Sequence, residues 1–187
     1  WGRAKKRHSG KASSMASKKQ RPLNDTRRAL TSVLYSKACD KFELDEVVHT
    51  DEWTLRMPAT SFVPDGQAIF EGLERHAARW NTKPEVVMHL RFPQDYPRAP
   101  PFVRVVSPRF AFHTGHVTVG GSLCTPILTM EGWDPSMTGE ALVLALHNLL
   151  IDGDGAIDLS VSYGYSEAEA KEAFQRVARD HNWTVAK

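Results

Sequence analysis

Cys124 stands in a segment that can carry covalent chemistry. It ends the run Gly120-Gly121-Ser122-Leu123-Cys124, and a Gly-Trp-Asp-Pro stretch follows at residues 132–135. Three interpretations are open for it: a small buried apolar side chain, the nucleophile of a cysteine hydrolase, or a thiol that carries an acyl group by thioester exchange. A hydrolase needs a histidine paired with an acid beside the thiol, and the sequence shows no recognisable pair of this kind.

Other metal-binding or nucleophilic side chains are few. His113 and His116 precede the cysteine and are expected to hydrogen-bond within a loop. A metal site with Cys124 is disfavoured, because only three irregularly spaced ligands are in view. Cys39 follows the first predicted helix and is expected to be structural. Two cysteines in unlike contexts exclude a disulfide framework and a four-cysteine zinc site, which indicates a reducing compartment.

The composition is that of a globular domain. The chain has 187 residues, of which 41% are hydrophobic and 25% charged, enough for one domain with an ordinary core. It has no long uninterrupted apolar run, so no membrane span is expected. The N-terminus lacks the apolar stretch of a secretory signal. Because the chain begins with Trp1 rather than Met, we expect it to be part of a longer protein.

Positive charge is concentrated at the N-terminus. Residues 1–21 hold eight of the 24 Lys and Arg residues and no Asp or Glu. We therefore predict a basic disordered tail over residues 1–22 and a folded domain over residues 23–187. The clusters at residues 5–7 and 18–21 fit a bipartite nuclear-import pattern, but contact with nucleic acid or another polyanion, or a solvated arm without function, are equally open. The expected location is cytoplasmic, nuclear or both.

Hydrophobic periodicity predicts the elements that must hold Cys124 in place. Helical spacing predicts one helix between Leu23 and Ala38 and another through Phe70, Leu73, Ala77 and Trp80. Alternating apolar residues predict four strands, which begin near Phe42, Trp53, Val86 and Val103.

The second half of the chain is predicted to be a loop and two helices. Residues 107–137 have few periodic features and indicate an ordered loop. A nearly all-apolar, and hence central, helix follows from Thr138. The last helix begins with a capping box at Ser166–Glu169. Because no helix joins one strand to the next by a crossover, the fold is expected to be α+β, with a four-stranded antiparallel meander packed on helices.

Several motifs, in this order along the chain, resemble those of ubiquitin-conjugating enzymes. Residues 96–101 match the Tyr-Pro-x-x-Pro-Pro signature of that family, and a strand, a loop with the cysteine, a Trp-x-Pro and a core helix follow. Similarity to the Q-type branch comes from the Gly-Gly-Ser-Leu-Cys run, residues 101–106, Gly132-Trp133, the helical insertion at 67–80 and the closing helix at 164–183. The resemblance covers about residues 23–183 and implies the ubiquitin-conjugating fold, with an N-terminal, a central and a C-terminal helix around the meander.

The resemblance implies an acyltransferase. Cys124 would accept ubiquitin as a thioester from the activating enzyme and pass it, with a ligase, to lysine amines of protein substrates. No cofactor on this protein is implied, since ATP and Mg are used by the activating enzyme, and no membrane partner is expected. The alternative is a catalytically weak or inactive ubiquitin-binding or scaffolding module on the same fold, because a fold does not fix a function.

The resemblance also assigns residues around the cysteine. His113-Thr114-Gly115 stand where the family has His-Pro-Asn, so His113 is expected to support the loop or the oxyanion. A backbone N–H of Gly120-Gly121 is a second candidate donor. An acid after the central helix, Asp152, Asp154 or Asp158, is expected to orient the acceptor amine, and Asp154 is preferred.

A second set of residues is implied to contact other proteins. Trp133 is expected to pack and to fix its loop. Contact with the activating enzyme and with ligases is expected at Pro97, Arg98, Pro135 and Ser136. Arg98 replaces an aromatic residue of many family members.

Overall fold

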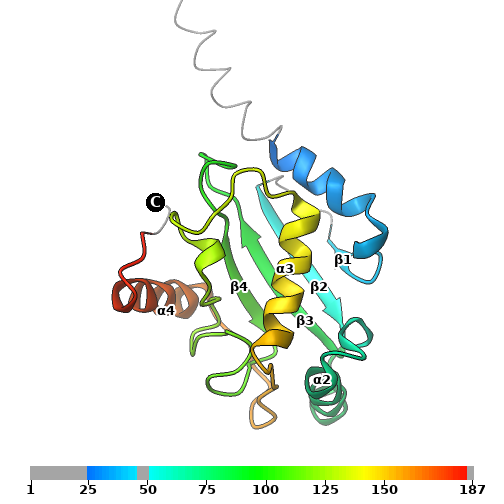
Figure 1. Cartoon of the computed structure of the whole chain (residues 1–187). Helices are drawn as coiled ribbons and strands as arrows, with labels where there is room; N and C mark the ends of the chain where they lie inside the picture. Colours follow the sequence, from blue (N-terminus) through cyan, green and yellow to red (C-terminus); the bar gives the residue numbers. More distant parts are fainter. Residues whose placement is uncertain (1–24, 46–50, 185–187) are drawn as a thin grey trace, which may run out of the picture.

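The four predicted strands form one antiparallel sheet. The computed structural model describes residues 25–45 and 51–184. The strands are β1 (Glu43–Leu44), β2 (Glu52–Pro58), β3 (Glu85–Arg91) and β4 (Phe102–Ser107), in the spatial order β1-β2-β3-β4. Each strand pairs with its neighbour in the chain, and a register shift interrupts the β3–β4 pairing at Val87/Met88. The predicted meander and the α+β class are confirmed (Figure 1).

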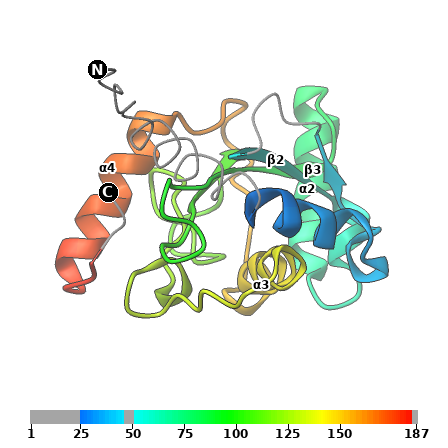
Figure 2. The same ribbon diagram turned by 90° about the horizontal axis from the view of Figure 1, so that it is seen from above.

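Helices surround this sheet. The first helix covers residues 25–34. The others are α2 (Gln67–Trp80), α3 (Gly139–Asp152) and α4 (Glu167–Asp180), with short 3-10 helices η1 (Lys37–Cys39), η2 (Ala59–Phe62) and η3 (Pro126–Leu128). The first helix and α3 lie on one face of the sheet, whereas α4 stands beyond the edge strand β4 (Figures 1 and 2). No helix in the described part of the chain is long and apolar enough to span a membrane.

The core lies between the sheet and α3. Along β2, the side chains of Trp53, Leu55 and Met57 alternate with half-buried polar ones and are fully buried. From α3, Leu142, Leu146 and Leu150 are equally inaccessible, so the predicted central position of this helix is confirmed. Strict alternation on the strands and an all-apolar helix are what a sheet with one helix-covered face requires.

Three element boundaries differ from the sequence-based expectation. The first helix ends at residue 34, and the chain restarts as η1, whose N-cap Ser36 accepts a hydrogen bond from the Ala38 N–H. The last helix ends at Asp180 rather than near Trp183, because Asn182 adopts a left-handed φ of 55° that a helix cannot contain. The first strand begins at Glu43, one residue after Phe42.

The remaining sequence expectations fall outside the described residues. The predicted tail at 1–22, with its import pattern, lies in the undescribed residues 1–24. The division into tail and domain therefore stays a prediction.

Candidate functional site

Cys124 lies in a loop that its backbone fixes firmly. It follows the isolated bridge between Val117 and Leu123 and precedes η3. The Cys124 N–H donates a 2.8 Å hydrogen bond to the carbonyl oxygen of His116. The thiol is half-buried, and this burial raises its pKa. By contrast, Cys39 is only 4% exposed, with a pKa also raised by burial.

The segment that carries the two predicted histidines is fixed to the end of α3. His113 and His116 both have left-handed backbones, with φ of 62° and 53°. Between them, the Gly115 N–H donates to the Gly153 carbonyl at 2.6 Å, and the Thr114 hydroxyl accepts from the Ala156 N–H at 3.2 Å. This segment, which stands where the family has His-Pro-Asn, is therefore built by backbone pairing with the residues just after α3.

The glycine pair before the cysteine serves packing. A β-carbon on Gly120 would collide with the Glu169 carbonyl oxygen, and one on Gly121 would collide with the Tyr165 ring. The Gly121 N–H donates to the Thr118 carbonyl at 2.9 Å. The expectation that this turn supplies an oxyanion donor is therefore wrong for Gly121, whose N–H is already used. The close approach that glycine permits is an approach to α4 and the loop before it.

A cleft of about 380 Å³ opens beside Cys124. One side is α4, which contributes one face of its second half; the other is the segment that holds the histidines, with Gly153 at the end of α3. The residues that line the cleft are Phe112, His113, His116, Val117, Thr118, Val119, Cys124, Gly153, Ala173, Arg176, Val177 and His181. The structure thus brings His113 and Cys124 to one cleft, as the sequence predicted. The contribution of α4 was missed, because helix periodicity does not reveal which neighbour a helix packs against.

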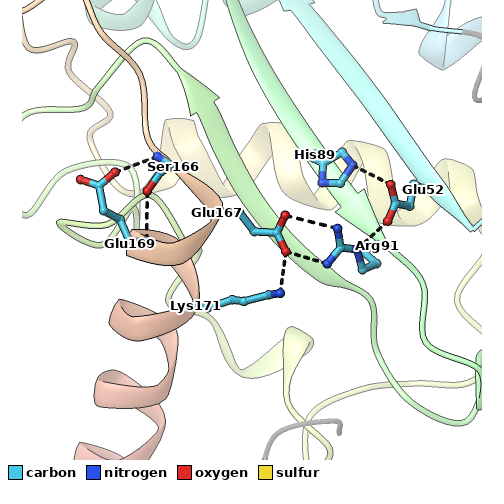
Figure 3. A network of polar contacts seen from close by, with 7 residues as sticks. All are labelled: Glu52, His89, Arg91, Ser166, Glu167, Glu169 and Lys171. Carbon is cyan, nitrogen blue, oxygen red and sulfur yellow. Dashed lines mark hydrogen bonds and ion pairs between the residues drawn. The ribbon is translucent and has the colours of Figure 1, made fainter.

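Ion pairs attach the start of α4 to the sheet. Arg91 of β3 contacts Glu52, its cross-strand partner on β2, at 2.7 Å, and Glu167 of α4 at 2.6 Å (Figure 3). Hydrogen bonds from Lys171 and Arg91 lower the pKa of Glu167 to about 2. Burial lowers the pKa of His89, so its 3.7 Å contact with Glu52 is not an ion pair at neutral pH.

A second carboxylate of α4 fixes the helix to the loop near the cysteine. Glu169 completes the predicted capping box by accepting from the Ser166 N–H, and it pairs with Arg109 at 2.6 Å. These contacts, the Ser166 backbone first, lower the pKa of Glu169 to about 2. The Arg109 guanidinium also lies over the Tyr165 ring, at 4.4 Å from its centroid.

The three predicted acids lie around the end of α3. Asp154 is exposed and has a φ of 50°, next to the cleft residue Gly153. The Asp158 carboxylate accepts from the N–H and hydroxyl of Ser160 at 2.8 and 2.6 Å, which lowers its pKa. Asp152 is exposed in the last turn of α3. None of the three lines the cleft in the described part of the chain.

The residues predicted to contact other proteins gather at a second site. Pro97, Pro135 and Ser136 line a shallow pocket of about 280 Å³ against the first helix. The indole N–H of buried Trp133 donates to the Pro97 carbonyl at 2.6 Å, which joins the two loops. Arg98 does not line this pocket; its side chain is 81% exposed and contacts Asp95.

A metal site is not evident in residues 25–45 and 51–184: no three His, Cys, Asp or Glu side chains there are arranged to hold an ion.

Comparison with known proteins identifies similar sequences. A family model described as ubiquitin-conjugating enzyme matches residues 83–182. A human relative, the Q-like protein 1 of the ubiquitin-conjugating enzymes, is 33% identical over 99 residues, which cover 51% of this chain and 60% of that protein. Ubiquitin-conjugating enzyme E2 25 of Caenorhabditis elegans is 25% identical over 174 residues, or 92% of this chain and 43% of that protein. The chain thus spans no more than 60% of the length of these relatives.

Solved structures show the same architecture. Human ubiquitin-conjugating enzyme E2 G1 superposes with a TM-score of 0.53 at 23% identity, over 71% of this chain and 96% of that chain. The enzyme UbcA1 from Agrocybe aegerita gives 0.51 at 16% identity, over 82% and 93%. At these identities the likeness concerns the fold alone.

Proposed function

This chain belongs to the ubiquitin-conjugating enzyme family, with Q-type members among its relatives, and on that premise we propose that it carries ubiquitin as a thioester on Cys124. From Cys124 it passes ubiquitin to lysine amines of protein substrates together with a ligase. The observation that carries the proposal is the contrast between the two cysteines. Cys124 is half-buried at the wall of a cleft, whereas Cys39 is buried in the core.

Loading is a thioester exchange. The Cys124 sulfur attacks the carbonyl carbon of the thioester that links ubiquitin to the activating enzyme, and that enzyme's cysteine leaves as a thiolate. The attacking species must also be a thiolate. Because burial raises the Cys124 pKa, the free thiol is the resting form at neutral pH, and its deprotonation accompanies the attack. The thioester bond itself brings the energy, since the activating enzyme has already used ATP and Mg to make it.

Discharge is an aminolysis. A neutral lysine amine attacks the thioester carbonyl, the carbon–sulfur bond breaks, and Cys124 leaves as a thiolate while the amine loses its proton. We assign orientation of the amine to Asp154, which stands beside the cleft residue Gly153 without a side-chain partner among the described residues. His113 supports the loop, since its segment is paired to the end of α3 and its ring packs on Phe112 with centroids 3.8 Å apart.

The pocket around Pro97, Pro135 and Ser136 is assigned to the activating enzyme and the ligase. It is concave, and Trp133 rigidly joins its two loops. A preformed shape of this kind lowers the entropic cost of binding. Arg98, exposed beside it, adds a positive charge at the rim.

A charging assay tests the proposal. Wild type, Cys124→Ala, Cys124→Ser and Cys39→Ala are mixed with ubiquitin, the activating enzyme and Mg-ATP and run on gels with and without reductant. We expect wild type and Cys39→Ala to form a band that reductant removes. Cys124→Ala forms none, and Cys124→Ser forms a reductant-resistant oxyester.

Two outcomes point elsewhere. A folded wild type that does not charge, yet binds ubiquitin, supports the binding or scaffolding module. A band that persists in Cys124→Ala moves the site away from this residue.

A further inference from the structure

The cleft beside Cys124 has a one-sided charge. Among the described residues that line it, Arg176 is the one side chain with a permanent charge, and none is a carboxylate. Three histidine rings and several apolar side chains complete the lining, with Phe112 72% exposed and Val119 53% exposed. A segment that enters the cleft therefore meets an exposed apolar surface and one fixed guanidinium.

Arg176 is held in place by the attachment of α4 at both ends. Glu167 fixes the start of the helix through Arg91, and the Thr184 N–H, just beyond its end, donates to the Glu131 carboxylate at 3.1 Å. On the helix itself, Arg176 contacts Glu172, four residues earlier, at 3.2 Å. The two side chains are 53% and 76% exposed, so this pair is weak and a ligand can replace it.

We propose that Arg176 is a specificity-determining residue, which selects acceptor segments with an Asp or Glu close to the modified lysine. The inference rests on the proposed thioester function and names the substrate class of that site. A carboxylate next to the acceptor lysine replaces Glu172 in a bidentate contact with the guanidinium. The neighbouring amine is then held at the same cleft as the Cys124 thioester.

Volume and chemistry agree with a peptide ligand. A cleft of about 380 Å³ lies within the range of pockets that enclose small ligands, and it has room for a short extended segment. Apolar walls contact the backbone and the aliphatic part of a lysine, while Arg176 recognises its acidic neighbour. Arginine is suited to this task, because its planar fork matches the geometry of a carboxylate.

The test compares acceptor peptides on a preformed thioester. Each peptide has a single lysine flanked by Glu or, in its matched partner, by Gln. Wild type should discharge to the Glu peptides faster by about two- to fivefold, the range expected for a partly exposed ion pair. Arg176→Gln should lose this preference, Arg176→Lys should keep part of it, and Glu172→Gln should keep or increase it. Higher salt should weaken it.

Arg179→Gln is the matched control, since Arg179 is on the same helix but does not line the cleft. Charging of every variant is measured first. If wild type fails to charge, the proposed function is overturned and this inference with it. If wild type charges but treats Glu and Gln peptides alike, or if Arg179→Gln loses the preference as Arg176→Gln does, the inference alone is overturned.

Discussion

The Cys124 N–H and the His116 carbonyl oxygen are joined by a hydrogen bond of 2.8 Å. His116 in turn has a left-handed backbone directly after Gly115, whose N–H donates to the Gly153 carbonyl at 2.6 Å. The position of the thiol is therefore set by the end of α3 through two backbone hydrogen bonds. A change at Gly153 should reach Cys124 although the two residues are far apart in the sequence.

Gly153→Ala is expected to impair charging by displacing this segment. A β-carbon at this position would lie 2.7 Å from the His116 nitrogen and 2.9 Å from the Gly115 carbonyl carbon, so the backbone must move. We expect a loss of about 1–3 kcal/mol in the free energy of unfolding, the usual cost of overpacking, together with slower charging. Urea unfolding and the initial rate of thioester formation measure the two effects.

Gly164→Ala is its control, because a β-carbon there would collide with the Val106 carbonyl oxygen on β4, not with the segment that holds Cys124. It should lower stability while the folded fraction charges at the wild-type rate. Equal charging defects in the two variants would show that lost stability, not displacement of Cys124, slows the reaction.

The reactivity of Cys124 should rise steeply with pH. Burial raises its pKa above the ordinary value for a thiol, about 8.5, so only a small fraction is thiolate at pH 7. The alkylation rate with iodoacetamide, followed by peptide mass spectrometry, should rise about tenfold per unit from pH 7 to 8 and level off above pH 8.5. Cys39 in the same samples should react far more slowly, since it is buried. A plateau below pH 8 would mean that a neighbour stabilises the thiolate.

Acid should release α4 before the rest of the fold. Glu167 and Glu169 have a pKa of about 2 in the folded protein against an ordinary 4.5. Their depressed pKa values stabilise the fold fully above pH 4.5, and this contribution is lost as pH falls toward 2. Backbone NMR shifts of α4 should therefore change at a higher pH than those of α3.

Arg91→Gln should move the α4 transition to higher pH and cost about 1 kcal/mol or less at pH 7, because these pairs are partly exposed. Arg98→Gln, which removes a more exposed pair with Asp95, should leave the transition where it is. Simultaneous loss of α3 and α4 in wild type and in Arg91→Gln would contradict the anchoring function of Arg91.

The parts of the fold that sequence alone predicted are those that rest on local patterns. Alternation in β2 exposes one face and buries the other, and the apolar run of α3 has no polar face to present to water. The capping box at Ser166 involves residues three positions apart. For α2 the predicted stripe began at Phe70, yet Ile69, Leu73 and His76 are the buried residues. The polar His76 is buried because its ring is hydrogen-bonded to the Val161 carbonyl and Thr82, contacts that helix periodicity cannot reveal.

The site was harder to predict, because distant pairings build it. The motif order located Cys124 and the histidines before it. The cleft, however, depends on α4, whose anchor joins Arg91 and Glu167 across 76 positions. Likewise, the glycine pair signalled a close approach, but the approaching group is the Tyr165 ring rather than a ligand. Sequence spacing shows that a residue tolerates close contact, not which group makes it.

Asp154→Asn is expected to slow discharge to lysine while leaving charging unchanged. Asparagine keeps the size of the side chain and tolerates the φ of 50°, so the substitution removes only the charge. If Asp154 orients the acceptor amine, the rate of discharge to free lysine should fall by up to about fivefold, the effect of one partly solvated charge contact. Asp158→Asn is the control, since the Asp158 carboxylate is bound to Ser160 and should not affect discharge. Single-turnover discharge from the preformed thioester measures both. An unchanged rate in Asp154→Asn, with a loss in Asp152→Asn, would transfer the assignment to the last turn of α3.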